Sequence, residues 1–233
     1  MQLLVSVRSA DEAQIMGRYP IDRLDLKEPL HGSLGATSVD TWQDVVPTWH
    51  ERFGVSIALG ELLDGPDASY VPQQTDSIKV GLSGCRGLSD WPDQLRLLYE
   101  SAPESVSRVA VYYADQQYAG CPLFEEVLEV AQHLACETIL VDTFGKLTGT
   151  VLNLLSESEL ISMRNAVHAI NCQFALAGSI QIDDLPAVKT IHPDIVAVRS
   201  AMCLADRSSQ ICEQQVAKFL NSFHESHVVT AQQ

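Results

Sequence analysis

Short apolar segments rich in valine and isoleucine recur along the chain, and each is almost continuously hydrophobic. Strands of a parallel sheet have this composition, because helices pack over the sheet and leave little of it facing water. The pattern predicts eight buried strands, at residues 3–7, 24–27, 55–59, 78–82, 109–113, 139–143, 174–177 and 195–199.

Segments with apolar residues at helical spacing lie between most of these strands. The clearest start is Ser156-Glu-Ser-Glu159, which fits a capping box: Ser156 and Glu159 would each bind the other's backbone N–H. Other helices are expected after a cap at Ser89 or Asp90, and at residues 123–135, 184–188 and 211–223. Residues 61–75 contain two prolines and are expected to form a loop.

Eight strands alternating with helices in 233 residues predict a single α/β domain, a closed (β/α)8 TIM barrel. We expect the barrel to span residues 1–223 and a flexible C-terminal tail to span 224–233. An open, doubly wound sheet is the alternative. No strand is followed by the G-x-G-x-x-G or Walker sequence with which such sheets often bind nucleotides, and this favours the barrel.

Composition narrows the class of protein. With 46% hydrophobic and 19% charged residues, the chain can bury a large core. Its net charge of -15 argues against binding to nucleic acid or to an anionic membrane, and no apolar run approaches the roughly 18 residues of a membrane span. The chain begins directly with a predicted strand rather than with the basic segment of a signal peptide.

The six cysteines are scattered and form no C-x-x-C pair, and the seven histidines show no H-x-x-x-H spacing. We therefore predict a reduced, cytoplasmic protein without a structural metal. We also expect a homo-oligomer, of a size that the sequence does not specify.

Charged residues gather at the carboxyl ends of the predicted strands, where barrel enzymes have their active sites. These residues are Asp25, Lys27, Lys79, Asp142 and Lys146, the last in the loop after the sixth strand. In residues 77–82 the alternation of side chains turns Lys79 into the barrel. A single strand-end lysine is most often a salt-bridged residue, but three of the chain's five lysines lie at this rim.

Clustered lysines and carboxylates suit carbonyl chemistry. An amine attacks a carbonyl only when it is deprotonated, and burial near other cations favours the neutral form of a lysine. The product is a Schiff base, which serves as an electron sink, and neighbouring carboxylates or a second lysine can move the protons.

A phosphate site is predicted after the seventh and eighth strands, where barrels commonly bind phosphate through backbone N–H groups and cations. The predicted phosphate ligands are Gly178, Ser179, Arg199, Ser200 and Arg207. Glycines in residues 31–35 make a second, weaker candidate, because turns use glycine in any case.

Taken together, these motifs closely resemble those of the archaeal (5-formylfuran-3-yl)methyl phosphate synthases. The motifs are Asp25-Leu-Lys-Glu-Pro29, Gly32-Ser-Leu-Gly-Ala36, Ile78-Lys-Val-Gly-Leu82, Tyr113-Ala-Asp115, Val141-Asp-Thr143 with Lys146, Ala175-Leu-Ala-Gly-Ser179, Asp194-Ile-Val196, Val198-Arg199 and Asp206-Arg207. They occur in one order from the first strand to about residue 211. The loop at 61–75 and the Phe144-Gly145 pair before Lys146 depart from the family pattern.

The resemblance implies a (β/α)8 lyase of methanofuran biosynthesis. Such enzymes condense two molecules of glyceraldehyde 3-phosphate into a furan aldehyde phosphate, with loss of phosphate and water. It implies that Lys27 is the Schiff-base lysine and Lys79 the proton acceptor, and that Asp25, Asp142 and Lys146 complete the site. The implied partner is a triose phosphate, and no cofactor is expected, because the imine supplies the electron sink.

Two other functions are compatible with the sequence. The D-x-K of Asp25-Leu-Lys27 also suits an aldolase or decarboxylase of the phosphate-binding barrels, although Leu30 stands where those decarboxylases carry a further aspartate. The third hypothesis is a barrel that binds a sugar phosphate without catalysing a reaction. Incubation with glyceraldehyde 3-phosphate alone separates the three, since only the synthase forms a furan and releases phosphate.

Overall fold

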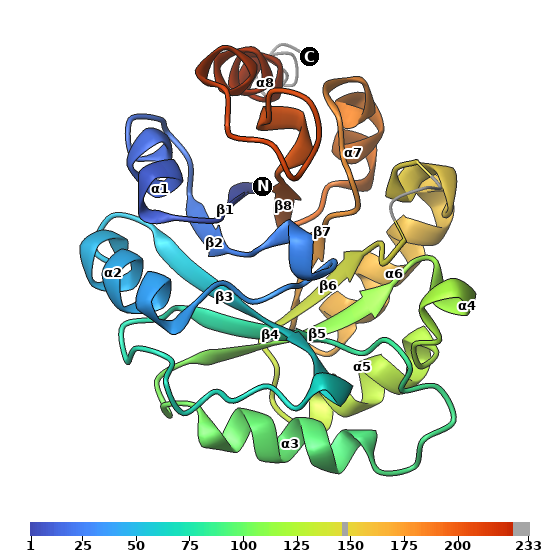
Figure 1. The fold of residues 1–233 in the computed structure, drawn as a ribbon. Helices are drawn as coiled ribbons and strands as arrows, with labels where there is room; N and C mark the ends of the chain where they lie inside the picture. Colours follow the sequence, from blue (N-terminus) through green and yellow to red (C-terminus); the bar gives the residue numbers. More distant parts are fainter. Residues whose placement is uncertain (146–148, 226–233) are drawn as a thin grey trace.

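Eight parallel strands close into one barrel, in which each strand pairs with its neighbours in sequence and β8 pairs with β1 (Figure 1). The computed structural model describes residues 1–145 and 149–225. The strands are β1 Gln2–Val7, β2 Arg23–Leu26, β3 Gly54–Glu61, β4 Ser77–Gly81, β5 Ser107–Tyr113, β6 Thr138–Asp142, β7 Gln173–Leu176 and β8 Ile195–Val198. The predicted (β/α)8 barrel is confirmed, and the open sheet is excluded.

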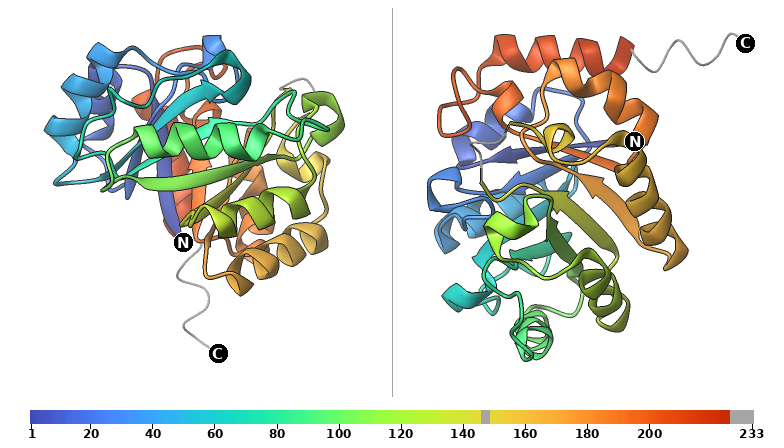
Figure 2. Two further views of the ribbon diagram at one scale, coloured as in Figure 1. Left: turned by 90° about the horizontal axis from the view of Figure 1, so that it is seen from below. Right: turned by 90° about the vertical axis from the view of Figure 1, so that its right-hand side faces the viewer.

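Helices surround the strands on the outside, as two further views show (Figure 2). The α-helices are α1 Ala10–Met16, α2 Val39–Trp49, α3 Trp91–Ser101, α4 Gln116–Ala119, α5 Phe124–His133, α6 Glu157–Ala169, α7 Leu185–Ile191 and α8 Glu213–Glu225. Single 3-10 turns are η1 Pro29–His31, η2 Leu62–Asp64, η3 Val151–Asn153, η4 Ile182–Asp184 and η5 Ser200–Met202. Among the described residues, no helix has the length and apolar character needed to cross a membrane.

Local signals explain several helix starts. The predicted capping box of α6 is present: the Glu159 N–H donates to the Ser156 hydroxyl at 3.3 Å, and the Ser156 N–H donates to Glu159 Oε2 at 2.8 Å. Asp90 precedes α3 as expected, but its carboxylate accepts a hydrogen bond from the Gln94 side chain and not from the backbone N–H groups of the helix. The prediction that the Asp90 side chain caps this helix is therefore wrong. Helix α8 ends at Glu225, two residues beyond the expected domain boundary, and the remaining tail from 226 lies outside the described residues.

One side of the barrel departs from the regular alternation of strand and helix. Residues 62–76, all of which are described, contain only the turn η2 and no α-helix between β3 and β4. Leu62, Ala68 and Val71 bury their side chains in this segment and cover the strands in place of a helix. The predicted loop is therefore correct, and it acts as part of the outer layer.

The segment after β2 crosses the mouth of the barrel instead of staying at its rim. The Ser33 hydroxyl donates to the Thr143 carbonyl at 2.7 Å, and the Leu34 carbonyl accepts from the Gly60 N–H at 2.8 Å. Ser33 and Leu34 are fully buried as a result. This crossing segment covers the barrel near β3 and β6 and leaves the side near β7 and β8 open.

Candidate active site

Lys27 stands at the open side of the barrel mouth, one residue beyond the end of β2. Its backbone N–H still donates to the Val7 carbonyl of β1, which fixes the point from which the side chain leaves. The Lys27 Nζ lies 3.8 Å from Asp142 Oδ2, and 15% of the lysine side chain is exposed. Lys27 lines both the outer cavity between β7 and β8 and the inner cavity of the barrel, so a substrate can reach its amine.

Below Lys27 the barrel holds a buried polar layer formed by residues from four adjacent strands. The Lys79 Nζ of β4 forms an ion pair with the Asp25 carboxylate of β2 and lies 3.1 Å from Ser56 Oγ of β3. Asp25 also accepts from the Ser6 and Ser56 hydroxyls, at 2.8 and 2.7 Å. These four residues are at most 4% exposed, so the Asp25 carboxylate is held in place from three sides.

Burial and neighbouring charges shift the pKa values of Lys79 and Asp25 in opposite directions. Burial lowers the pKa of Lys79, and the nearby Asp25 carboxylate raises it by less, so the net pKa lies below the ordinary value. Burial raises the pKa of Asp25, but the cations Lys79 and Lys27 outweigh that effect and bring it below its usual range. Asp25 is thus ionised, while Lys79 gives up its proton more readily than a lysine in water does.

Asp142 is anchored at the end of β6. Its Oδ1 accepts from the Thr143 N–H at 2.7 Å, and the Ser33 hydroxyl lies 3.4 Å from Oδ2. The loop beyond it is held by the buried Asp115, whose carboxylate accepts from the N–H groups of Phe144 and Gly145 at 2.7 and 2.6 Å. The predicted catalytic Lys146 follows directly, but it lies outside the described residues.

The outer cavity brings the predicted phosphate ligands together. It is lined by Lys27, Gly178, Ser179, Ser200 and Arg207, among others. Gly178 and Ser179 have φ angles of 97° and 60°, and a side chain at Gly178 would contact Val151 and Thr143. Within the described residues the backbone N–H groups of Ser179 and Ser200 donate to no protein acceptor, so both can serve a bound anion.

Arg199 also lines the outer cavity, but the protein itself binds its guanidinium. Its Nη1 donates to the Ser6 carbonyl and to Glu12, and its Nη2 donates to Glu12 and to the Ser209 carbonyl. Its Nε donates to the Arg207 carbonyl at 2.6 Å. A guanidinium has five N–H groups, so the protein itself engages all of them, and Arg199 supports the site rather than presenting free donors.

Arg207 presents a guanidinium to this cavity. One of its terminal nitrogens donates to the Pro29 carbonyl at 2.9 Å, and the side chain is half-buried. Burial lowers the pKa of Arg207, and the negative charge of Asp142 partly offsets this effect. A guanidinium stays charged at any pH at which the protein is folded, and its planar fork matches a phosphate group.

Three polar residues of the site were not predicted from the sequence. Ser6 and Ser56 interrupt otherwise apolar strands, and their register places both beside Asp25: Ser6 pairs with Asp25 and Asp25 with Ser56. That alternation was a usable signal. Glu12, on α1, had no such signal. Among the described residues no group of histidine, cysteine and carboxylate side chains could hold a metal ion, and each described cysteine is a free thiol.

The sequence also matches known proteins. Residues 3–220 match the family model described as 4-HFC-P synthase. The chain belongs to this family. The (5-formylfuran-3-yl)methyl phosphate synthase of Methanosarcina barkeri is 28% identical over 231 residues, with 94% of this chain and 98% of the relative covered. The synthase of Methanococcus maripaludis is 30% identical over 230 residues, with 94% and 97% covered.

Solved structures of low identity share the fold. The 3-hexulose-6-phosphate synthase from Salmonella typhimurium superposes with a TM-score of 0.64 at 16% identity, over 96% of this chain and all of that chain. The phosphoribosyl anthranilate isomerase from Thermotoga maritima gives 0.63 at 14% identity, over 97% and 99%. At these identities the likeness supports the barrel alone.

Proposed function

We propose that this protein is a lyase that condenses two molecules of glyceraldehyde 3-phosphate into (5-formylfuran-3-yl)methyl phosphate, an early step of methanofuran biosynthesis. The main support for this proposal is the position of Lys27, whose amine lies between a cavity suited to phosphate and the buried Lys79–Asp25 ion pair. Membership of the 4-HFC-P synthase family supports the choice of reaction, since the relatives carry that synthase name.

In the proposed first step the Lys27 amine gives up its proton and adds to the aldehyde carbon of one triose phosphate, and loss of water gives an imine. The imine nitrogen draws electrons from the adjacent carbon, so the proton on that carbon becomes acidic. Asp142, 3.8 Å from the Lys27 amine, can stabilise the protonated imine and move protons during its formation.

Lys79 is the proposed base for the second step. It lies below Lys27 in the same inner cavity, and burial keeps its pKa below the ordinary value, as a proton acceptor near neutral pH requires. Asp25, fixed by Ser6 and Ser56, receives the charge of the protonated Lys79 without rearrangement.

Removal of that proton leaves an electron pair that can expel phosphate from the neighbouring carbon. Expulsion of phosphate leaves an enol conjugated to the iminium. Its terminal carbon attacks the middle carbon of the second triose phosphate, after proton transfers have moved the carbonyl group to that carbon, and this forms the new carbon–carbon bond. Ring closure and release of Lys27 by hydrolysis complete the furan. The sum balances as two triose phosphates giving one furan aldehyde phosphate, one phosphate and two molecules of water, with no net oxidation.

Gly178, Ser179, Ser200 and Arg207 are the proposed ligands of the phosphate that the product retains, with Arg199 holding the loop in place. Purified protein with glyceraldehyde 3-phosphate as sole substrate tests the proposal. We expect a furan chromophore and one inorganic phosphate per furan, with loss of both in the Lys27→Ala variant. Binding of the triose phosphate without either product would instead favour a non-catalytic sensor, and a cleaved or decarboxylated sugar phosphate an aldolase or decarboxylase.

A further inference from the structure

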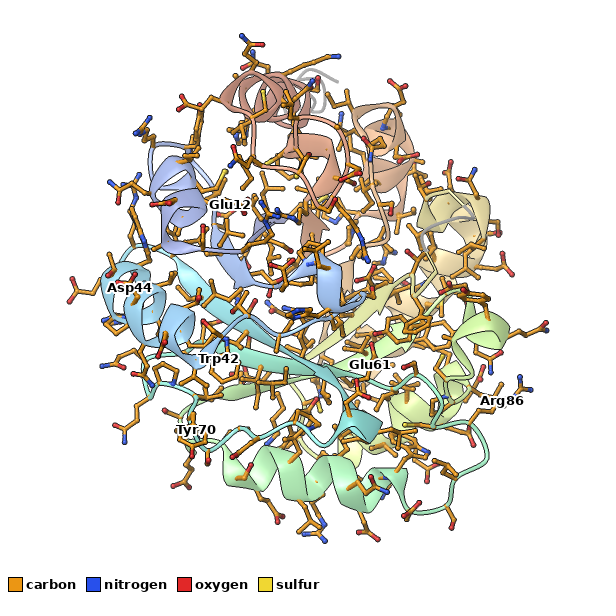
Figure 3. All side chains as sticks on the ribbon, in the orientation of Figure 1. Glu12, Trp42, Asp44, Glu61, Tyr70 and Arg86 are labelled. Carbon is orange, nitrogen blue, oxygen red and sulfur yellow. The ribbon has the colours of Figure 1, made fainter. Side chains whose placement is uncertain are left out.

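Glu12 is a buried carboxylate on α1, outside the set of residues that face the proposed substrate. In Figure 3 it lies between α1 and the segment that follows β8, whereas Arg86 points outward into solvent. Its side chain is 6% exposed and binds two arginines at once. Arg199 donates to both of its oxygens, at 2.8 and 3.2 Å, and Arg8 donates from its backbone N–H at 2.8 Å and from Nε at 3.1 Å.

The two arginines hold three successive carbonyl groups of the loop after β8. Arg199 donates to the carbonyls of residues 207 and 209, at 2.6 and 3.2 Å. Arg8 donates to the carbonyl of residue 208 at 2.6 Å. The turn has its own internal support, because Asp206 accepts from the N–H groups of residues 208 and 209. The arginines therefore fix where this turn stands, while Asp206 fixes its shape.

The side chain presented by this turn is Arg207. Its guanidinium contacts the Pro29 carbonyl across the barrel mouth and lines the outer cavity with Ser179 and Ser200. Without Glu12 the two buried or half-buried arginines would lose their common counter-charge and repel each other. The carbonyl contacts that depend on their positions would then loosen.

We propose that Glu12 is a positioning residue that sets the phosphate affinity of the outer cavity by holding Arg8 and Arg199, and through them the turn that carries Arg207. This inference rests on the proposed function only in taking the outer cavity as the phosphate subsite. It assigns Glu12 no contact with substrate.

Titration calorimetry with inorganic phosphate tests this inference on the purified full chain. Glu12→Gln keeps the size of the side chain and removes its charge, and we expect phosphate to bind at least about tenfold more weakly. The matched control is Glu213→Gln, which removes a carboxylate from an exposed pair with Arg18 and should leave affinity unchanged. Wild-type affinity in a folded Glu12→Gln protein would overturn the proposal.

A double-mutant cycle separates positioning from a general loss of structure. Arg207→Met removes the presented cation directly. If Glu12 acts through Arg207, then Glu12→Gln in the Arg207→Met background should weaken phosphate binding no further. An equal loss in both backgrounds would refute the mechanism. In steady-state kinetics with glyceraldehyde 3-phosphate, Glu12→Gln should raise KM much more than it lowers kcat.

Arg8→Gln keeps the test decisive if circular dichroism shows that Glu12→Gln does not fold. Arg8 is partly exposed, and its loss leaves the Glu12–Arg199 pair intact while freeing the carbonyl of residue 208. We expect severalfold weaker phosphate binding, again absent in the Arg207→Met background, and unchanged affinity would count against the inference. The result is independent of the reaction assigned: wild-type protein that forms no furan refutes the proposed function but leaves this comparison valid.

Discussion

The Lys79 amine and the Asp25 carboxylate form an ion pair inside the barrel, and the Ser56 hydroxyl contacts both of them. Breaking a buried pair by removing one partner is costly, about 3–5 kcal/mol, because the other charge stays behind without compensation. The pair is therefore both a structural feature of the interior and, in the proposed mechanism, a base with its counter-charge.

Lys79→Met should lower kcat by about 10²- to 10⁴-fold, the usual contribution of a positioned general base. Formation of the imine at Lys27 should persist, because that step uses a different amine. Steady-state kinetics and borohydride trapping measure the two effects separately. The neutral double variant Lys79→Met, Asp25→Asn should recover thermal stability but no activity. A single variant with wild-type kcat would remove Lys79 from the mechanism.

Asp25→Asn should shift the pH dependence of kcat in a defined direction. The Asp25 charge raises the pKa of Lys79 against the larger, lowering effect of burial. Without that charge Lys79 becomes neutral at lower pH, so the rise of kcat with pH should move to lower pH even though kcat itself falls. Asp76→Asn, which breaks an ion pair with Arg23 at the amino-terminal end of the strands, is the control. A shift towards higher pH would contradict the assigned electrostatics.

Gly81→Ala should destabilise the protein by about 1–3 kcal/mol, as overpacking does in well-packed interiors. Above Gly81 the Tyr113 hydroxyl donates to Glu61 Oε1 at 2.6 Å, and a methyl group on Gly81 would collide with both groups. Chemical denaturation measures the loss. Gly54→Ala is the control, because its methyl group would meet only side-chain atoms of Arg23 and Asp76, at 3.3 Å or more. Equal stability of the two variants would argue against this packing.

The contribution of Glu12 to stability should disappear in acid. Burial raises the pKa of Glu12, but Arg199 and Arg8 together lower it by more than burial raises it. The folded-state pKa therefore lies below the ordinary 4.5. A depressed carboxylate pKa stabilises the fold fully above the unfolded value and progressively less as pH falls through the folded value. The difference in unfolding free energy between wild type and Glu12→Gln should therefore be largest near neutral pH and shrink below 4.5. A constant difference would contradict this account.

The barrel could be predicted from sequence because its signal is local. All eight strands lie where continuous apolar runs placed them, within two residues at either end. The helices α1, α2 and the four-residue α4 were not predicted. Helix α1 has seven residues and buries Glu12 beside its apolar side chains, which weakens its apolar stripe. Helix α2 has an apolar face at Trp42, Val45 and Val46, but Pro47 within it argues against a helix.

Only those site residues could be predicted that lie at strand ends or that the alternation of side chains along a strand turns into the barrel. Asp25, Lys27, Lys79 and Asp142 gather because the carboxyl ends of parallel strands share one rim. The hydrogen bonds of the Arg199 guanidinium to the protein could not be predicted in the same way. Its partner Glu12 lies 187 residues earlier in the chain, and the sequence around Arg199 does not reveal that all five of its N–H groups are engaged.

Lys27 is the centre of the proposed chemistry, and covalent labelling of its amine is the decisive test. The protein is incubated with glyceraldehyde 3-phosphate, reduced with borohydride, digested and mapped by mass spectrometry. Lys27→Arg keeps a cation near Asp142 but cannot form the imine, and Lys189→Arg, on helix α7, is the control. We expect a reduced triose adduct on Lys27 that is lost in Lys27→Arg and retained in Lys189→Arg. Furan formation without any adduct, or with undiminished labelling of Lys27→Arg, would contradict the proposed role of Lys27.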